Sequence, residues 1–262
     1  MDEGHDRIGA AAAQVVEARL ARRRLARLAG IETLEDGYDV QARANATLEE
    51  HLGPRVGHKI GGTTAAMRAY INAPEPVAGE VFAAIVHPAG SRLKLSDYVR
   101  PGVETEIAVR LKLDMPARGQ PYTREDAAEA VDALMAAIEI VDDRYEDFRT
   151  MGVATLVADN AFDAGSLLGE PVLTLDPLDT GALAARTFRD GELVAEGLSD
   201  ALLGHPLDAL AWLANRRSSL GLGLEAGAFV SLGSITPVQW VERPGTYRVE
   251  VEGLGAVEVS FG

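Results

Sequence analysis

The chain has 262 residues, 47% of them hydrophobic, enough for one large domain or for one domain with a helical appendage. Its formal net charge of -15 excludes nucleic acid as a partner, because a nucleic-acid backbone needs a basic stripe that this sequence lacks. The absence of cysteine excludes disulfides, a thiolate nucleophile and zinc-cysteine sites.

The N-terminal stretch has acidic residues where a secretory signal has basic ones, and Glu17 interrupts its apolar run. No stretch approaches the roughly 18 uninterrupted apolar residues of a membrane-spanning helix. We therefore expect a cytoplasmic protein that does not interact with a membrane.

Two helices are predicted at the start of the chain. Residues 8–29 show an amphipathic pattern that stops at Gly30, a usual position for a helix to end. A second helix is expected over about 33–52, ended by the Gly-Pro pair at 53–54. The three arginines at 22–24 are interpreted as a solvated helix face.

Short apolar runs follow, separated by Gly and Pro, and they favour β-strands at 80–88, 103–111 and 228–234. An Asp-Gly pair at 190–191 between two apolar-leaning runs predicts a β-hairpin. The alternation of apolar residues over 247–261 across a Gly-Leu-Gly turn predicts a second hairpin with one buried face.

Two further helices interrupt these strands. The first is predicted over 123–141, with Thr123 as its N-cap and Asp126 in the position of a capping-box acid. The second begins after His205, which is expected to serve as a cap or to lie on the surface, and has Pro206 in its first turn.

The expected class is therefore α+β. An N-terminal helical segment, residues 1–53, is expected to pack on a β-rich catalytic domain, residues 54–262. No stretch rich in Pro, Gly and Ser separates the two.

The segment VETEIAVRL, residues 103–111, carries the first candidate site. In a strand, Glu104 and Glu106 share one face because side chains alternate with period two. Two carboxylates so close repel each other unless a cation, a proton or water intervenes, and their hard oxygen atoms suit Mg²⁺ or Mn²⁺. The alternative is a strand whose alternating glutamates face solvent.

A third candidate ligand is Glu139, which Ile138 and Ile140 flank. These neighbours draw the carboxylate toward the interior, where it needs a partner such as a metal ion. The alternative is a helix C-terminus with solvated charges.

Other catalytic motifs are absent from the sequence. The five histidines show no i, i+4 pair of the kind that binds zinc, and His58 is expected on the strand face opposite to Lys59. Neither a G-x-S-x-G nucleophile motif nor a nucleotide-binding glycine pattern occurs.

The order of motifs from about residue 37 to the end resembles the 2-oxopent-4-enoate hydratase group of the fumarylacetoacetate hydrolase superfamily. The motifs that carry this resemblance are GYDVQ (37–41), GHKIGGTTAAM (57–67), EPVAGEVF (75–82), ETEIAVRL (104–111), IEIVDDR (138–144), VADNA (157–161), HPLDALAWLAN (205–215), AGAFVSLGSIT (226–236) and GLGAVEVSF (253–261).

The resemblance implies a β-rich roll or distorted barrel with flanking helices, assembled as a homo-oligomer. It implies that Glu104, Glu106 and Glu139 hold Mg²⁺ or Mn²⁺. The implied reaction is hydration of a 2-hydroxy-2,4-dienoate, a small 2-oxo acid in its enol form, to a 4-hydroxy-2-oxo acid, in the breakdown of aromatic compounds.

Lys59 falls on the catalytic lysine of the family, and Asn160 and Ser234 fall in motifs near its substrate pocket. Lys59 is expected to orient the substrate carboxylate or to exchange a proton. Proton exchange requires burial or a nearby cation to lower the lysine pKa from about 10.4.

Two departures from the family pattern concern the substrate. Val77 replaces an acidic residue of the hydratases, which leaves a 4-oxalocrotonate decarboxylase as the alternative enzyme. Phe162 and Asp163 replace small hydroxylated residues after the Asp-Asn-Ala motif. A third alternative is a non-catalytic oligomer that binds small acids.

Overall fold

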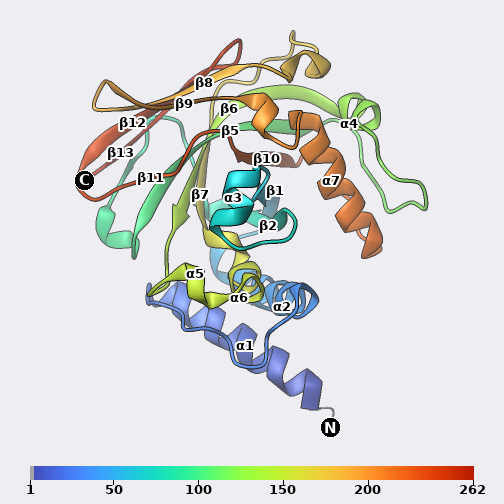
Figure 1. Ribbon diagram of the computed structural model, residues 1–262, viewed down its shortest axis with the longest axis vertical. Helices are drawn as coiled ribbons and strands as arrows, with labels where there is room; N and C mark the ends of the chain where they lie inside the picture. Colours follow the sequence, from blue (N-terminus) through green and yellow to red (C-terminus); the bar gives the residue numbers. More distant parts are fainter. Residues whose placement is uncertain (1–2) are drawn as a thin grey trace.

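The computed structural model describes residues 3–262 and has two β-sheets with helices around them (Figure 1). In spatial order the larger sheet consists of β2 (Val77–Phe82), β1 (Arg55–Gly61), β10 (Phe229–Ser234), β5 (Pro101–Leu111), β6 (Val131–Asp142), β7 (Asp163–Leu168) and β3 (Val86–His87), while β11 (Gln239–Trp240) pairs with β5. The smaller sheet consists of β4 (Arg92–Leu93), β13 (Gly255–Phe261), β12 (Gly245–Val251), β8 (Ala184–Arg189) and β9 (Glu192–Leu198).

The helices lie on two sides of the sheets. In Figure 1, α1 (Glu3–Leu20), α2 (Leu34–Leu52), α5 (Phe148–Met151) and α6 (Val153–Ala158) lie below the larger sheet, α3 (Ala65–Tyr70) lies near β1 and β2, and α4 (Arg124–Ala130) and α7 (Pro206–Ser219) lie to the right. Short 3₁₀ turns complete the chain: η1 (Ala83–Ile85), η2 (Leu95–Asp97), η3 (Asn160–Phe162), η4 (Pro177–Thr180) and η5 (Ser199–Ala201). This arrangement confirms the expected α+β class with a mostly β body.

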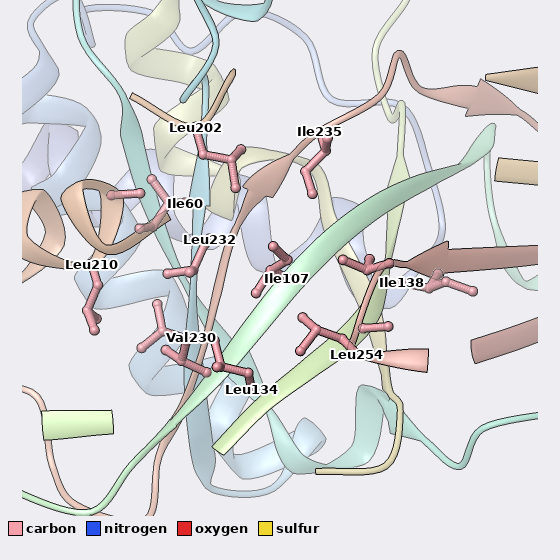
Figure 2. Packing of buried hydrophobic residues seen from close by; sticks show 14 of the residues in the cluster. Ile60, Ile107, Leu134, Ile138, Leu202, Leu210, Val230, Leu232, Ile235 and Leu254 are labelled. Atoms are coloured by element: carbon pink, nitrogen blue, oxygen red, sulfur yellow. The ribbon is translucent and has the colours of Figure 1, made fainter. Parts of the chain in front are cut away.

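Three clusters of buried hydrophobic residues hold these layers together, the third being a small one that includes Val81 and Phe229. The main core packs apolar side chains from both sheets and α7, and Figure 2 shows Ile60, Ile107, Ile138 and Leu232 among them. The second core packs α1 and α2 against α5 and α6 and includes Val77 from β2. The N-terminal helices thus share a core with later parts of the chain, and the division after residue 53 stays a prediction.

The first helix is shorter than predicted. The pattern over 8–29 predicts one helix, but α1 ends at Leu20 and Arg22 adopts a left-handed φ of 52°. Beyond this turn the amide of Leu25 donates a hydrogen bond to the carbonyl of Arg144 at 2.7 Å. Leu25 and Leu28 are buried in the second core although their segment is not helical. The helical spacing of apolar residues therefore predicted the burial of this segment but not its backbone structure.

The helix predicted over 123–141 was also wrong beyond its first turns. It ends at Ala130, and residues 131–142 form β6. This strand pairs with β5 on one side and β7 on the other and is almost entirely buried, so its sequence is a nearly continuous apolar run. Glu139 therefore lies in a central strand, not at a helix C-terminus.

Other elements match the expectations. Thr123 caps α4 in the predicted capping box with Asp126, and the His205 side chain caps α7 by accepting a hydrogen bond from the amide of Leu207. The hairpin turn at Asp190 and Gly191 has the positive φ angles, 51° and 88°, of a two-residue loop. The strand predicted at 80–88 was wrong as a single element, because this run divides into the end of β2, η1 and β3. None of the described helices is long and apolar enough to cross a membrane.

Candidate metal and active site

The three predicted glutamates meet on one face of the larger sheet. Glu104 of β5 lies directly opposite Glu139 of β6 in the antiparallel register, and Glu106 follows two residues later on the same face. One carboxylate oxygen from each of the three lies within 4.8 Å of the others. Glu106 and Glu139 are buried and Glu104 is half-buried, so the alternative of solvent-facing glutamates is wrong.

Strand β10 fixes the orientation of Glu106. The Ser231 hydroxyl and the Gly233 amide both donate to Oε2 of this carboxylate, the amide at 3.1 Å. Gly233 has a φ of 109°, and a Cβ at this position would lie 2.1 Å from Oγ1 of Thr63. Glycine is therefore required where β10 approaches both Glu106 and Thr63.

Burial makes these carboxylates hard to ionise together. It raises the pKa of Glu104 to about 8, with a further contribution from the charge of Glu139. Burial, followed by the charge of Glu104, raises the pKa of Glu106 to about 7. Burial also raises the pKa of Glu139 well above its usual range, although the nearby Lys59 opposes this rise.

These carboxylates fit a hard divalent cation. Oε1 of Glu106 and Oε2 of Glu139 are buried and have no hydrogen-bond partner among the described residues. Unpaired buried oxygens of this kind are costly, and a dication that accepts their lone pairs removes that cost.

Lys59 supplies a buried positive charge to this cluster. Its Nζ lies 2.9 Å from Oε1 of Glu139 and donates to the carbonyl of Ala161 at 2.7 Å. Burial alone lowers the pKa of Lys59, but the charges of Glu139, Glu104 and Glu106 outweigh it and raise the pKa. The lysine therefore stays protonated as long as no other cation offsets the negative charge of these carboxylates.

A strained turn brings the Ala161 carbonyl to Lys59. Asn160, Ala161 and Phe162 all have positive φ angles, at 58°, 50° and 67°, which non-glycine residues rarely adopt. The Asn160 side chain holds this turn: its Oδ1 accepts from the Glu80 amide at 2.9 Å, and its Nδ2 donates to the Glu80 carbonyl at 2.6 Å and to Asp163 at 3.1 Å.

Asn160 and Ser234 occupy different places relative to the pocket beside Lys59. Asn160 is buried behind the lining, whereas Ser234 lines the pocket and donates its hydroxyl to the Thr236 carbonyl at 2.7 Å. The hydroxyl oxygen of Ser234 retains lone pairs for another donor. The substrate-binding roles of both residues stay predictions.

The pocket wall beyond the glutamates is mostly apolar. Its lining includes Lys59, Glu104, Thr63, Ser234 and two glycines, together with Met67, Tyr70, Ile71, Val77, Val141, Phe148, Leu156, Ala161, Phe162, Val238 and Trp240. Most of these apolar residues come from α3, α5, α6, η3 and the segment before β11, which are distant in sequence. The periodicity of apolar residues within a single helix or strand therefore could not predict that these residues line one pocket.

Of the two residues that depart from the family pattern after the Asp-Asn-Ala motif, Phe162 lines the pocket and Asp163 does not. Asp163 is fully buried at the start of β7, and its Oδ2 lies 3.3 Å from the guanidinium of Arg19 on α1. Burial raises its pKa, while the charges of Arg19, Lys59 and Arg144 oppose that rise. It thus links the N-terminal helix electrostatically to the site.

His58 lies on the strand face opposite to Lys59, as expected from alternation. It lines a separate cavity together with Arg55 and Arg217. Burial, followed by the charges of these arginines, lowers its pKa to about 3, so this imidazole is neutral at neutral pH.

Comparisons with known proteins agree with this geometry. The sequence model described as fumarylacetoacetate (FAA) hydrolase C-terminal matches residues 59–261. A 2-keto-4-pentenoate hydratase of Paraburkholderia phymatum is 37% identical over 98% of both chains. A 4-oxalocrotonate decarboxylase of Pseudomonas putida is 32% identical over 87% of this chain and 86% of its own.

A similar fold has been solved in complex with a metal. The structure of 4-oxalocrotonate decarboxylase from Pseudomonas putida G7, complexed with magnesium and adipate, matches with a TM-score of 0.91 and 29% identity, covering 98% of both chains. With the family model matching most of the chain and close relatives aligned over nearly its full length, this protein belongs to the fumarylacetoacetate hydrolase family.

Proposed function

We propose that this protein is a lyase that hydrates a 2-hydroxy-2,4-dienoate in the breakdown of aromatic compounds, with Mg²⁺ or Mn²⁺ as its cofactor. One observation carries the proposal: three carboxylates lie within 4.8 Å of one another, and Lys59 lies 2.9 Å from one of them at the wall of an apolar pocket. Relatives named as hydratases, 37% and 36% identical, support hydration.

Glu104, Glu106 and Glu139 are the proposed metal ligands. A dication held by these residues would supply charge stabilisation for the substrate carboxylate, its C2 oxygen and the enolate. Ser231 and Gly233 hold Glu106 in place for this role through their hydrogen bonds to Oε2.

Lys59 is the proposed group that moves a proton. The Ala161 carbonyl and Glu139 fix its buried ammonium group at the wall of the pocket. In the proposed reaction the C2 hydroxyl loses a proton and C5 gains one, which gives a conjugated enone. Water then adds its oxygen at C4 and a proton at C3.

The alternative lyase reaction is decarboxylation of an unsaturated 2-oxo diacid such as 4-oxalocrotonate. It is favoured by Val77, which is buried and lines the pocket where hydratases generally carry an acid. Relatives named as decarboxylases support it as well. Both proposed reactions use the same carboxylate cluster. Hydration adds water across C3 and C4, whereas decarboxylation breaks the bond between carbon and a carboxylate group.

One assay separates these reactions. Purified protein with Mg²⁺ is incubated with 2-hydroxypenta-2,4-dienoate or with 4-oxalocrotonate, and dienol absorbance and released CO₂ are followed. We expect loss of dienol absorbance without CO₂. Release of CO₂ without hydration would overturn the proposal.

Glu106→Ala tests the third alternative, a non-catalytic small-acid binder. We expect this variant to lose turnover. Absence of turnover in the unsubstituted protein, together with binding of small acids, would instead support the binder.

We further infer that the protein forms a homo-oligomer, which size-exclusion chromatography tests. We also infer that it lies in the cytoplasm, which cell fractionation tests.

A further inference from the structure

The charged groups of the pocket belong to the glutamate cluster. Among the described residues, Lys59 and Glu104 are the only Lys, Arg, Asp, Glu or His side chains in its lining. The acidic head of a substrate therefore has a charged partner only at this end.

Aromatic rings form much of the remaining wall. The ring centroids of Tyr70 and Phe148 lie 4.8 Å apart, and those of Phe148 and Phe162 lie 5.7 Å apart. Trp240 and Met67 complete this surface. Phe162 occupies it at the expense of a φ of 67°, unusual for a bulky residue and typical of functional positions.

The cations near this wall already have partners. Arg68 donates to two backbone carbonyls, at 2.9 and 3.1 Å. Arg100 pairs with Asp143 at 3.0 Å, and Arg149 pairs with Asp147 at 2.8 Å. In the part of the chain that the structure describes, Lys59 is the only cationic side chain that lines the pocket, so a second substrate carboxylate would lie against rings without a cation of the lining to pair with, which is unfavourable.

We propose that the substrate has a single carboxylate and that its far end is an uncharged alkyl or aryl group packed on the ring surface. This inference rests on the proposed function and selects, among 2-hydroxy-2,4-dienoates, those with a hydrocarbon substituent at C5. Met67, Tyr70, Phe148 and Phe162 are the proposed specificity-determining residues. The net charge of -15 also disfavours a substrate with two negative charges.

Binding of unreactive 2-oxo acids tests the tail separately from turnover. Calorimetry in the presence of Mg²⁺ compares oxalate, 2-oxoheptanoate and 2-oxoadipate. We expect 2-oxoheptanoate to bind at least about 100-fold more tightly than 2-oxoadipate, because an apolar site rejects an unpaired carboxylate. Each added methylene in a series of apolar tails should tighten binding about fourfold.

A charge introduced on the wall should reverse this preference. Met67→Arg places a guanidinium in the pocket from α3, and we expect 2-oxoadipate to bind at least about tenfold more tightly and 2-oxoheptanoate more weakly. Ala66→Arg is the matched control, since Ala66 is exposed on the same helix and does not line the pocket. This control should leave both affinities unchanged.

The outcomes separate this inference from the proposed function. If oxalate does not bind with Mg²⁺, the proposed metal-held head, and with it the proposed function, is wrong. If oxalate binds and the unsubstituted protein takes 2-oxoadipate as tightly as 2-oxoheptanoate, the inference about the tail alone is wrong. The affinities of the unsubstituted protein for 2-oxoheptanoate and 2-oxoadipate test the inference even if Met67→Arg fails to fold.

Discussion

Lys59 and the glutamates around it are buried so close together that the charge of each depends on the others. The carboxylates keep the lysine protonated, and the lysine offsets part of their repulsion. A bound dication would take over that second role, because it offsets the same charges. Lys59 would then be free to exchange a proton.

Removal of the ammonium group should therefore affect turnover more than metal binding. We expect Lys59→Met to lower kcat by about 10²- to 10⁴-fold, the usual contribution of a positioned acid or base. Lys59→Arg keeps the charge but transfers protons poorly and should also be impaired. Calorimetric titration with Mn²⁺ checks that the metal still binds. A Lys59→Met enzyme with kcat within tenfold of the unsubstituted protein contradicts the catalytic role.

The raised carboxyl pKa values predict a pH-dependent response to metal. Between the usual value of 4.5 and about 8, the folded protein keeps the Glu104 proton that the unfolded chain releases. The resulting contribution to stability is present at low pH and is lost as the pH rises through this range. Because metal must displace these protons, we expect Mn²⁺ to raise the Tm more at pH 8 than at pH 6.

Scanning calorimetry with and without Mn²⁺ measures this difference. Glu104→Gln is the control, because it removes the carboxyl group whose pKa burial raises to about 8 while it keeps a similar shape. It should bind metal more weakly and show a smaller pH dependence. Equal shifts in Tm at both pH values would show that the carboxylates do not hold protons as inferred.

At the scale of elements, the turn η3 connects the fold to the site. Asn160 uses both ends of its amide to hold this turn, and its backbone has a φ of 58°. We expect Asn160→Ala to lower the free energy of unfolding by about 2–4 kcal/mol, because it leaves buried partners of the amide unpaired and keeps an unfavourable φ.

Asn160→Gly separates these two causes. It removes the same hydrogen bonds but accepts a positive φ, so it should be about 1 kcal/mol more stable than Asn160→Ala. Urea denaturation measures both variants, and kcat shows whether the Ala161 carbonyl still reaches Lys59. Equal stability of the two variants would mean that the φ of this residue is not strained.

Part of this site could be predicted from the sequence because it depends on short-range rules. The period of two in a strand placed Glu104 and Glu106 on one face, and the apolar neighbours of Glu139 predicted its burial. The strand β6 was predicted as a helix because a central strand, buried on both faces, lacks alternation. Pairing with β5 and β7, a long-range contact, decides its structure.

Other parts depend on contacts that no local pattern encodes. The positive φ angles at Asn160 to Phe162 occur without glycine and are imposed by the surrounding hydrogen bonds. The apolar wall gathers side chains from elements far apart in the chain. The motif order located the charged head of the pocket, and the fold was needed to reveal its apolar end.

At the scale of the whole molecule, the net charge of -15 should act in opposite directions on the metal and the substrate. The negative field attracts Mn²⁺ and repels an anionic dienoate, and salt screens both effects over a Debye length of about 10 Å at 0.1 M. We expect KCl, raised from 20 to 200 mM, to weaken Mn²⁺ binding and, at saturating Mn²⁺, to raise kcat/KM for the dienoate about two- to threefold.

The decisive result is that Mn²⁺ affinity falls with KCl while kcat/KM rises. A general effect of salt on folding would change both quantities in the same direction. In the proposed reaction, Lys59 and a bound metal would be the positive groups that meet the substrate, and their attraction would act at short range inside the pocket, where salt screens little. A kcat/KM that falls with salt would show instead that local attraction at the pocket outweighs the field of the whole acidic surface.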